Sequence, residues 1–156
     1  MKIERVWAMP NKRTFQIKPI KRLIDKYRYI GDWIDPFPYP FKEDALDYLK
    51  KFKDNSVDGV LFDPPYSARQ LKECYENKGQ HLTFDDTKNT TWMNWRKEIA
   101  RVVKPNGYVI SFGWCSTGMG NKKLFKKIEI LLVCHGGQHH DTIVVVEQKV
   151  NKTLMF

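Results

Sequence analysis

Apolar residues recur at intervals of three and four in three stretches of the chain, and this spacing is typical of amphipathic helices. The helices are predicted over residues 14–29, 42–52 and 92–103. Between and after them lie short runs rich in β-branched and aromatic residues, which predict strands. The strands are expected over residues 29–34, 56–62, 108–112, 127–134 and 142–146. Helices that alternate with strands in this way predict an α/β fold.

No internal repeat and no low-complexity linker divides the 156 residues, so we expect a single domain over residues 1–156. No apolar run approaches the length of a membrane span, and the charged start of the chain is unlike a signal peptide. The three cysteines are odd in number and far apart, which favours small core residues in a reducing compartment. We therefore expect a cytoplasmic protein with no membrane partner.

The most informative motif is Asp63-Pro64-Pro65-Tyr66, which directly follows the apolar run of residues 56–62. Two prolines stop a strand because they donate no backbone hydrogen bond. The motif should therefore stand at the carboxyl end of a buried strand, where open α/β sheets bind their ligands. A plain proline turn with a tyrosine packed nearby is the competing interpretation.

In this setting the tetrapeptide resembles the catalytic motif of the amino-methyltransferases, which methylate the exocyclic amine of adenine or cytosine. The aspartate form is usual among the adenine enzymes, so the chain resembles the S-adenosylmethionine-dependent DNA adenine (N6) methyltransferases. Other blocks follow in the order and spacing of that family. They are residues 13–27, 34–37, 44–50, 54–58 and 98–108.

The resemblance implies a Rossmann-like class I methyltransferase sheet, mostly parallel, with a C-terminal antiparallel hairpin. It implies one methyltransferase domain with no separate target-recognition domain. The implied activity is site-specific transfer of a methyl group from S-adenosylmethionine to the exocyclic amine of adenine in DNA.

The resemblance also assigns roles to the motif. The lone pair of an aromatic amine is delocalised into the ring, so acceptors aimed at its N–H groups make the nitrogen more nucleophilic. Asp63 and the carbonyl of Pro64 would supply these acceptors, Pro65 would stiffen the turn, and Tyr66 would stack on a flipped-out base.

For the methyl donor, the acidic candidates are Asp35 and Asp44, which would bind its amino group and its adenosine part. Phe37 and Phe112 would pack on its adenine or its sulfonium. No metal is expected, because the spacing of the histidines at 135, 139 and 140 matches no structural zinc pattern.

One feature departs from the family. A donor-binding domain should have a glycine-rich loop, a helix and a second strand after its first strand. Here only residues 38–43 separate Phe37 from Asp44, too few for a parallel crossover. We expect the written sequence to lack a flexible segment, with a physical break in the chain between Phe37 and Pro38. The alternative is a cofactor-deficient relative.

Net charge is +9, which favours polyanions. We expect DNA as the partner, with RNA possible, and an interface on the basic helix. Its candidate residues, Lys18, Lys21, Arg22 and Lys26, should share a face with the catalytic cleft. Two further functions stay open: a catalytically degenerate nucleic-acid-binding relative or partner subunit, and a methyltransferase that acts on RNA or cytosine. The sequence does not predict the oligomeric state.

Overall fold

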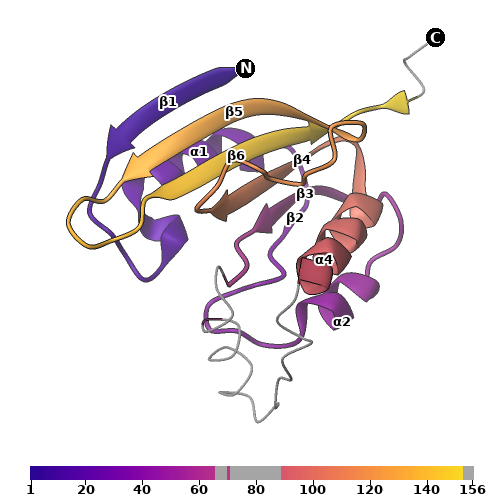
Figure 1. The fold of residues 1–156 in the computed structure, drawn as a ribbon. Coiled ribbons are helices and arrows are strands. Elements are labelled where there is room, and N and C mark those ends of the chain that lie inside the picture. Colours follow the sequence, from indigo (N-terminus) through magenta and orange to yellow (C-terminus); the bar gives the residue numbers. More distant parts are fainter. Residues whose placement is uncertain (66–69, 71–88, 153–156) are drawn as a thin grey trace.

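The computed structural model describes residues 1–65, 70 and 89–152. Its six strands form one sheet in the order β1-β5-β6-β4-β3-β2 (Figure 1). The strands are β1 (Lys2–Trp7), β2 (Trp33–Ile34), β3 (Val57–Phe62), β4 (Val103–Gly113), β5 (Phe125–Cys134) and β6 (Thr142–Lys149). The helical elements are η1 (Thr14–Gln16), α1 (Lys18–Arg28), α2 (Ala45–Lys50) and α4 (Asn89–Val102).

Only β6 runs against its neighbours among the described strands. It pairs antiparallel with both β4 and β5, whereas the pairs β1–β5, β2–β3 and β3–β4 are parallel. The other five strands therefore share one direction, and their carboxyl ends meet at one edge of the sheet. This arrangement confirms the predicted Rossmann-like sheet with a closing antiparallel hairpin.

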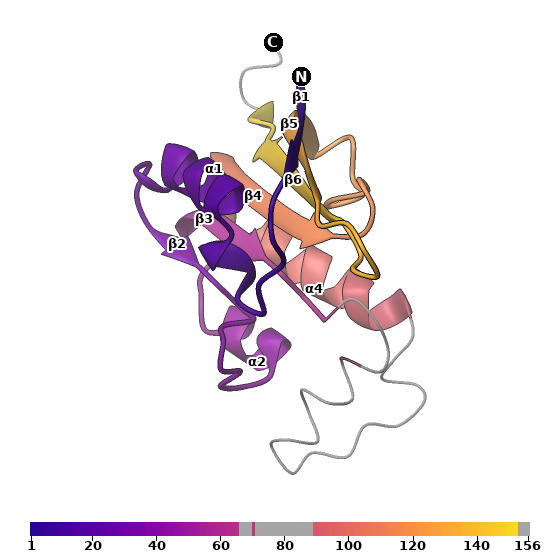
Figure 2. The same ribbon diagram turned by 90° about the vertical axis from the view of Figure 1, so that its left-hand side faces the viewer.

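Helices cover the two faces of the sheet at different places, as the views in Figures 1 and 2 show. Helix α1 buries Ile20, Leu23 and Ile24 against side chains of the central strands and β5. On the opposite face, α2 and α4 enclose a second core whose largest fully buried side chain is Trp95. That second core lies over β3 and β4, so the same face of β1 and β5 carries no helix among the described elements.

The connection from β2 to α2 differs from the prediction. The backbone runs without a break from Ile34 through residues 35–44 into α2, so the expected discontinuity after Phe37 is wrong. Strand β2 connects directly to its neighbour β3 through α2. The 35–56 connection is long enough for that single crossover. No described strand lies beyond β2, which forms one edge of the sheet.

Two other parts of the sheet differ from the sequence pattern. Strand β1 was not predicted, because its run is short and half of its residues are charged, so it carries little hydrophobic signal. Residues 104–107 precede the predicted strand of residues 108–112 but lie within β4. The pairing with β3 jumps there from Val57↔Val103 to Gly59↔Tyr108, and Asn106 adopts a left-handed φ of 65°. These residues thus form a bulge within the strand.

Lys149, near the end of β6, ties three segments together. Its Nζ donates to the carbonyl oxygens of Ala100 at 2.7 Å and Val103 at 2.6 Å, and to Asn55 Oδ1 at 2.9 Å. These carbonyls lie where α4 passes into β4, and helix ends leave such groups without partners inside the helix. The ammonium group therefore caps α4 and fixes it to the sheet. Among the described residues, no helix has the length and apolar character needed to cross a membrane.

We expect Lys149→Met to lower the free energy of unfolding by about 1–3 kcal/mol, because carbonyl oxygens would lose a charged donor. Urea denaturation followed by circular dichroism measures the change. Lys126→Met, at an exposed position on β5, is the matched control and should stay within about 0.5 kcal/mol of the parent. Equal losses in the two variants would show that the cap contributes nothing.

Candidate active site

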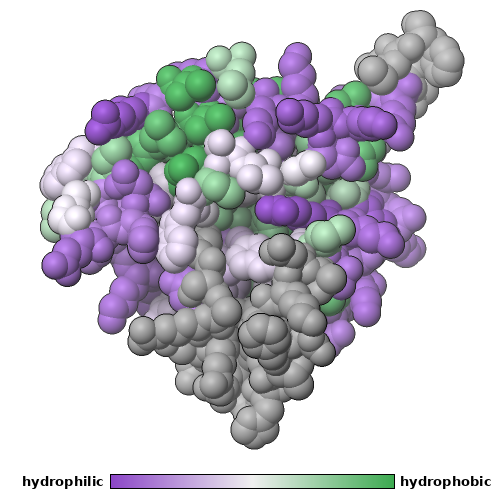
Figure 3. Space-filling model, viewed as in Figure 1, coloured by the Kyte–Doolittle hydropathy of each residue, from purple (hydrophilic) through white to green (hydrophobic). Residues whose placement is uncertain are grey.

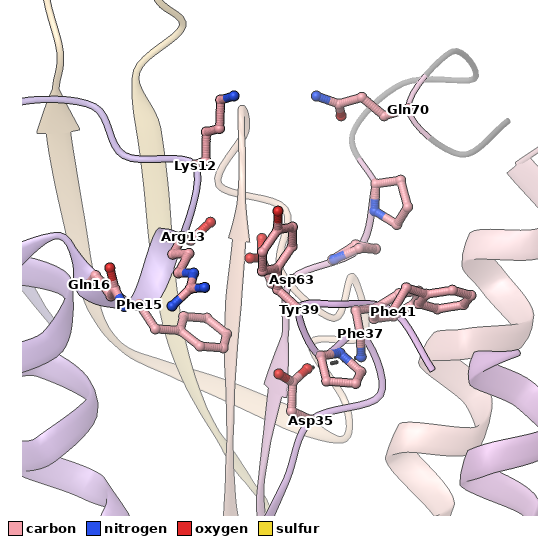
Figure 4. A pocket seen from close by; sticks show the side chains of 14 residues that line it. Lys12, Arg13, Phe15, Gln16, Asp35, Phe37, Tyr39, Phe41, Asp63 and Gln70 are labelled. Atoms are coloured by element: carbon pink, nitrogen blue, oxygen red, sulfur yellow. Dashed lines mark hydrogen bonds between the residues drawn. The ribbon is translucent and has the colours of Figure 1, made fainter. Parts of the chain in front are cut away.

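A cleft of about 680 Å³ opens where the connections after β2 and β3 meet the segment that precedes α1 (Figure 4). A volume of this size suits a small organic ligand. Three segments supply the described lining: residues 12–16 from η1 and its approach, residues 35, 37–39 and 41 after β2, and residues 63–65 after β3, together with Gln70. The cleft therefore lies at the carboxyl edge of the parallel strands, where α/β sheets bind ligands.

Asp63 reaches this cleft because β3 ends at the preceding residue. The strand is almost wholly buried, and its last residues Leu61 and Phe62 face opposite cores. The double proline then turns the chain out of the sheet, with Asp63 and Pro65 partly exposed and Pro64 buried. Tyr66 lies outside the described residues, so its stacking on a base stays a prediction.

Asp35 is the second carboxylate of the cleft, and it comes from the end of β2. Its Oδ1 accepts a hydrogen bond of 2.9 Å from the backbone N–H of Phe37. Burial raises the pKa of Asp35 to about 6, and the negative charge of Asp63 adds to the increase. The N–H of Phe37 only partly offsets this effect. The buried charge of Asp35 would therefore be stabilised by a cationic group placed in the cleft.

Aromatic rings form much of the remaining wall. Phe37 stacks on Phe41 with ring centroids 6.5 Å apart and contacts Trp95 of the core edge-on at 4.8 Å. Across the cleft, the Arg13 guanidinium lies over the ring of Tyr39, 5.5 Å from its centroid. The cleft thus combines carboxylates with ring faces, a set of groups that suits a cation or a planar aromatic ligand.

Two predicted donor-binding residues do not line the cleft. Asp44 is the N-cap of α2, and its Oδ1 accepts a 3.0 Å hydrogen bond from the backbone N–H of Asp47. Phe112 is buried on the α1 side of the sheet, where its ring contacts Phe15 at 5.0 Å. Phe15 itself lines the cleft, so Phe112 supports the wall from behind.

The basic residues of α1 do not gather around the cleft as predicted. The helix starts beside the cleft at Lys18 and leads toward the opposite edge. There the Lys26 ammonium binds Glu129 Oε2 at 2.7 Å, and Glu129 pairs with the first residue of β1. Arg22 and Lys26 line a separate groove between α1 and β1. Lys21 pairs with Asp25 one turn further along the exposed face.

Among the described residues, the basic side chains that line the cleft are those of Lys12 and Arg13. They precede η1 in the same basic part of the sequence, whereas the predicted interface was placed on the helix that follows them. Tyr39 and Phe41 were also missed as site residues. The signal for them is the run Pro38-Tyr39-Pro40-Phe41, in which prolines alternate with aromatic residues soon after Asp35.

The three histidines of the β5–β6 connection are placed separately. His135 is buried, with Nδ1 2.9 Å from the carbonyl oxygen of Ala8 and Nε2 2.8 Å from Thr142 Oγ1, whereas the ring of His140 stacks on Trp114. In the described part of the chain, no group of three or more His, Cys, Asp or Glu side chains could hold a metal ion. Cys115, expected in the core, is exposed.

A stretch of 71 residues, 45% of this chain, is 32% identical to the Type II methyltransferase M.PvuII of Proteus hauseri, of which it spans 19%. Among solved structures, HI0767 of Haemophilus influenzae, a candidate methylase, is 12% identical, with a TM-score of 0.37 over 70% of this chain and 48% of that one. The PH0226 protein of Pyrococcus horikoshii OT3 is 14% identical, with a TM-score of 0.43 over 95% and 81%. No protein-family model matches the chain. The sequence match is thus confined to one part of a longer enzyme.

The raised pKa of Asp35 predicts a pH-dependent stability. Between about pH 4 and pH 6 the folded state retains a proton that the unfolded state releases, so this group destabilises the fold progressively as pH rises. Relative to Asp35→Asn, the parent should lose about 2 kcal/mol of unfolding free energy between pH 4 and pH 7. Urea titrations at several pH values measure this difference.

Asp32→Asn is the matched control, since Asp32 is exposed just before β2. Its stability should follow that of the parent across the same range. A difference between the parent and Asp35→Asn that does not change with pH would contradict the buried-charge interpretation.

Proposed function

We propose that this chain transfers a methyl group from S-adenosylmethionine to the exocyclic amine of adenine in DNA. The observation that carries the proposal is the position of Asp63-Pro64-Pro65, which leaves a buried parallel strand and lines a cleft beside a second carboxylate. The local match to M.PvuII supports a methyltransferase, and the resemblance of the motif supports the adenine amine as the target.

In this proposal Asp63 acts on the amine that receives the methyl group. Its carboxylate accepts an N–H of the amine, and the carbonyl of Pro64 accepts the other. The nitrogen lone pair is then less delocalised into the ring, so it would bond to an electrophilic methyl carbon more readily as the bond from that carbon to its sulfur breaks. The positively charged nitrogen that results would release one N–H proton to solvent. Prolines at 64 and 65 offer no competing backbone N–H, so the acceptors are preorganised for the amine.

The described residues also fit the donor. S-adenosylmethionine, when bound, supplies a methyl group carried on a sulfonium cation. Asp35, whose partly buried carboxylate favours a nearby positive charge, would bind the amino group or face the sulfonium. The rings of Phe37 and Phe41 would pack on its apolar parts. The carboxylate of Asp44 caps α2, so we do not assign it to the adenosine part of the donor.

A second function is favoured by one specific observation. The unbroken connection from β2 to α2 has no glycine-rich loop, and no described strand follows on the outer side of β2. The described part of the chain therefore offers no acidic residue at the end of a second strand to bind a ribose. A nucleic-acid-binding relative or partner subunit without its own catalysis would keep the base-binding side of the cleft and lose the donor side.

We expect Asp63→Asn to reduce methyl transfer by at least about 100-fold, because the amide replaces a charged acceptor with a weaker one. The assay uses radiolabelled S-adenosylmethionine with DNA and RNA oligonucleotides that contain adenine or cytosine. Asp32→Asn is again the control and should keep the parent rate. Equal transfer by Asp63→Asn and the parent would place the chemistry elsewhere.

The same assay separates the alternatives. Transfer to RNA or to cytosine alone would change the substrate and keep the enzyme. Absence of transfer, together with no heat of donor binding in calorimetry and retained binding of oligonucleotides, would establish the binding relative instead.

Binding of DNA should depend on the basic rim of the cleft. Arg13→Gln and Lys12→Gln should each reduce the slope of log affinity against log salt by about one, because each removes a phosphate contact. Fluorescence anisotropy with a labelled duplex measures the slopes. Lys26→Gln, whose ammonium pairs with Glu129 at the opposite edge, is the control. If Lys26→Gln reduces the slope more than Arg13→Gln does, the DNA interface lies on α1.

A further inference from the structure

Strand β1 ends the sheet and exposes apolar side chains along its length. It pairs with β5 on one side only in the described structure. Lys2, Glu4 and Val6 point toward α1, whereas Ile3 and Trp7 lie on the opposite face and are 61% and 66% exposed. No described helix covers that face here, and Figure 3 shows hydrophobic residues gathered on it over β1 and β5.

The backbone of β1 is also open for pairing. The N–H of Ala8 donates to the carbonyl oxygen of Cys134 at 3.0 Å, so even-numbered residues direct their polar groups to β5. Because these groups alternate along a strand, Ile3 and Arg5 direct theirs to the free edge. An exposed edge of this kind pairs readily with another strand.

We propose that a second copy of this chain pairs with β1 across a two-fold axis, antiparallel and centred on Ile3. Odd-numbered residues must then face odd-numbered residues, so the axis passes through a residue of β1 and its counterpart in the second copy. A two-fold axis at Lys2, at Glu4 or at Arg5 would place a charged side chain directly opposite the same residue of the second copy, which is repulsive. The axis at Ile3 sets Lys2 against Glu4 of the second copy, twice, with the two Ile3 side chains between the copies.

The register is self-complementary in charge and in polarity. In one copy alone, Lys2 Nζ binds Glu4 Oε2 at 2.7 Å and Glu129 Oε1 at 3.4 Å, so the ammonium and carboxylate groups already share the α1 face of β1. In the pair, each would gain a cross-strand partner on the α1 face. On the other face, the exposed Ile3 side chains would cover each other and join the uncovered surfaces of both sheets. Pairing at the β1 edge is independent of the proposed function.

Charge reversal tests the register. Lys2→Glu places a second carboxylate against Glu4 of the other copy, and Glu4→Lys places a second ammonium group against Lys2. Each variant alone should associate at least about tenfold more weakly than the parent, since two attractive contacts become repulsive. An equimolar mixture of the two should recover association. In the mixed dimer, the two carboxylates of one copy face the two ammonium groups of the other, so both cross-strand pairs are attractive again.

Sedimentation velocity from about 10 to about 500 μM suits the weak association expected of a small interface. Lys53→Glu, at an exposed position after α2, makes the same change of charge as Lys2→Glu and should behave as the parent. Thermal melting shows that each variant is folded, and recovery in the mixture shows it again. A monomeric parent throughout this range, variants that associate as the parent does, or a mixture that stays monomeric would each overturn the proposal.

Discussion

The contact between Trp33 and Gly59 sets the geometry on which the candidate site depends. Strand β2 contributes only Trp33 and Ile34 to the sheet, paired with Gly59 and Val60. The indole ring of Trp33 lies across Gly59 at the position that a Cβ atom would occupy. A glycine is therefore required in the middle of β3, although it weakens a strand. A change of register would move Asp35 away from Asp63.

The short crossover has consequences for the chemistry of the cleft. Since β2 leads straight into α2, the segment between them must form the cleft wall by itself. It does so with rings and prolines, and Phe37 fastens it to Trp95 in the core. A glycine-rich loop binds a ligand through backbone N–H groups, whereas this wall offers ring faces and the partly buried carboxylate of Asp35. Selectivity for a donor would then come from stacking and from the charge of Asp35.

Sequence patterns predicted the parts of the structure that local physics determines. The double proline located the end of β3 and hence Asp63, and hydrophobic periodicity found α1 and the final hairpin. The errors have a common cause: they depend on contacts distant in sequence. Phe112 and Asp44 have side chains that suit the donor, but Phe112 lies in the core on the α1 side of β4 and Asp44 caps the start of α2. Likewise, β1 becomes a strand only because β5 is there to pair with it.

The distribution of charge within the cleft separates two kinds of ligand. Lys12 and Arg13 come from a segment that is exposed to solvent, where a polyanion would meet them first. Asp35 lies deeper, and its raised pKa shows that its charge is poorly solvated. A phosphate backbone is therefore attracted to the rim and repelled from the interior, while a cation is favoured inside. A nucleic acid held at the rim could reach Asp63 only through a base extended toward it, because a neutral base avoids the repulsion that its phosphate would meet.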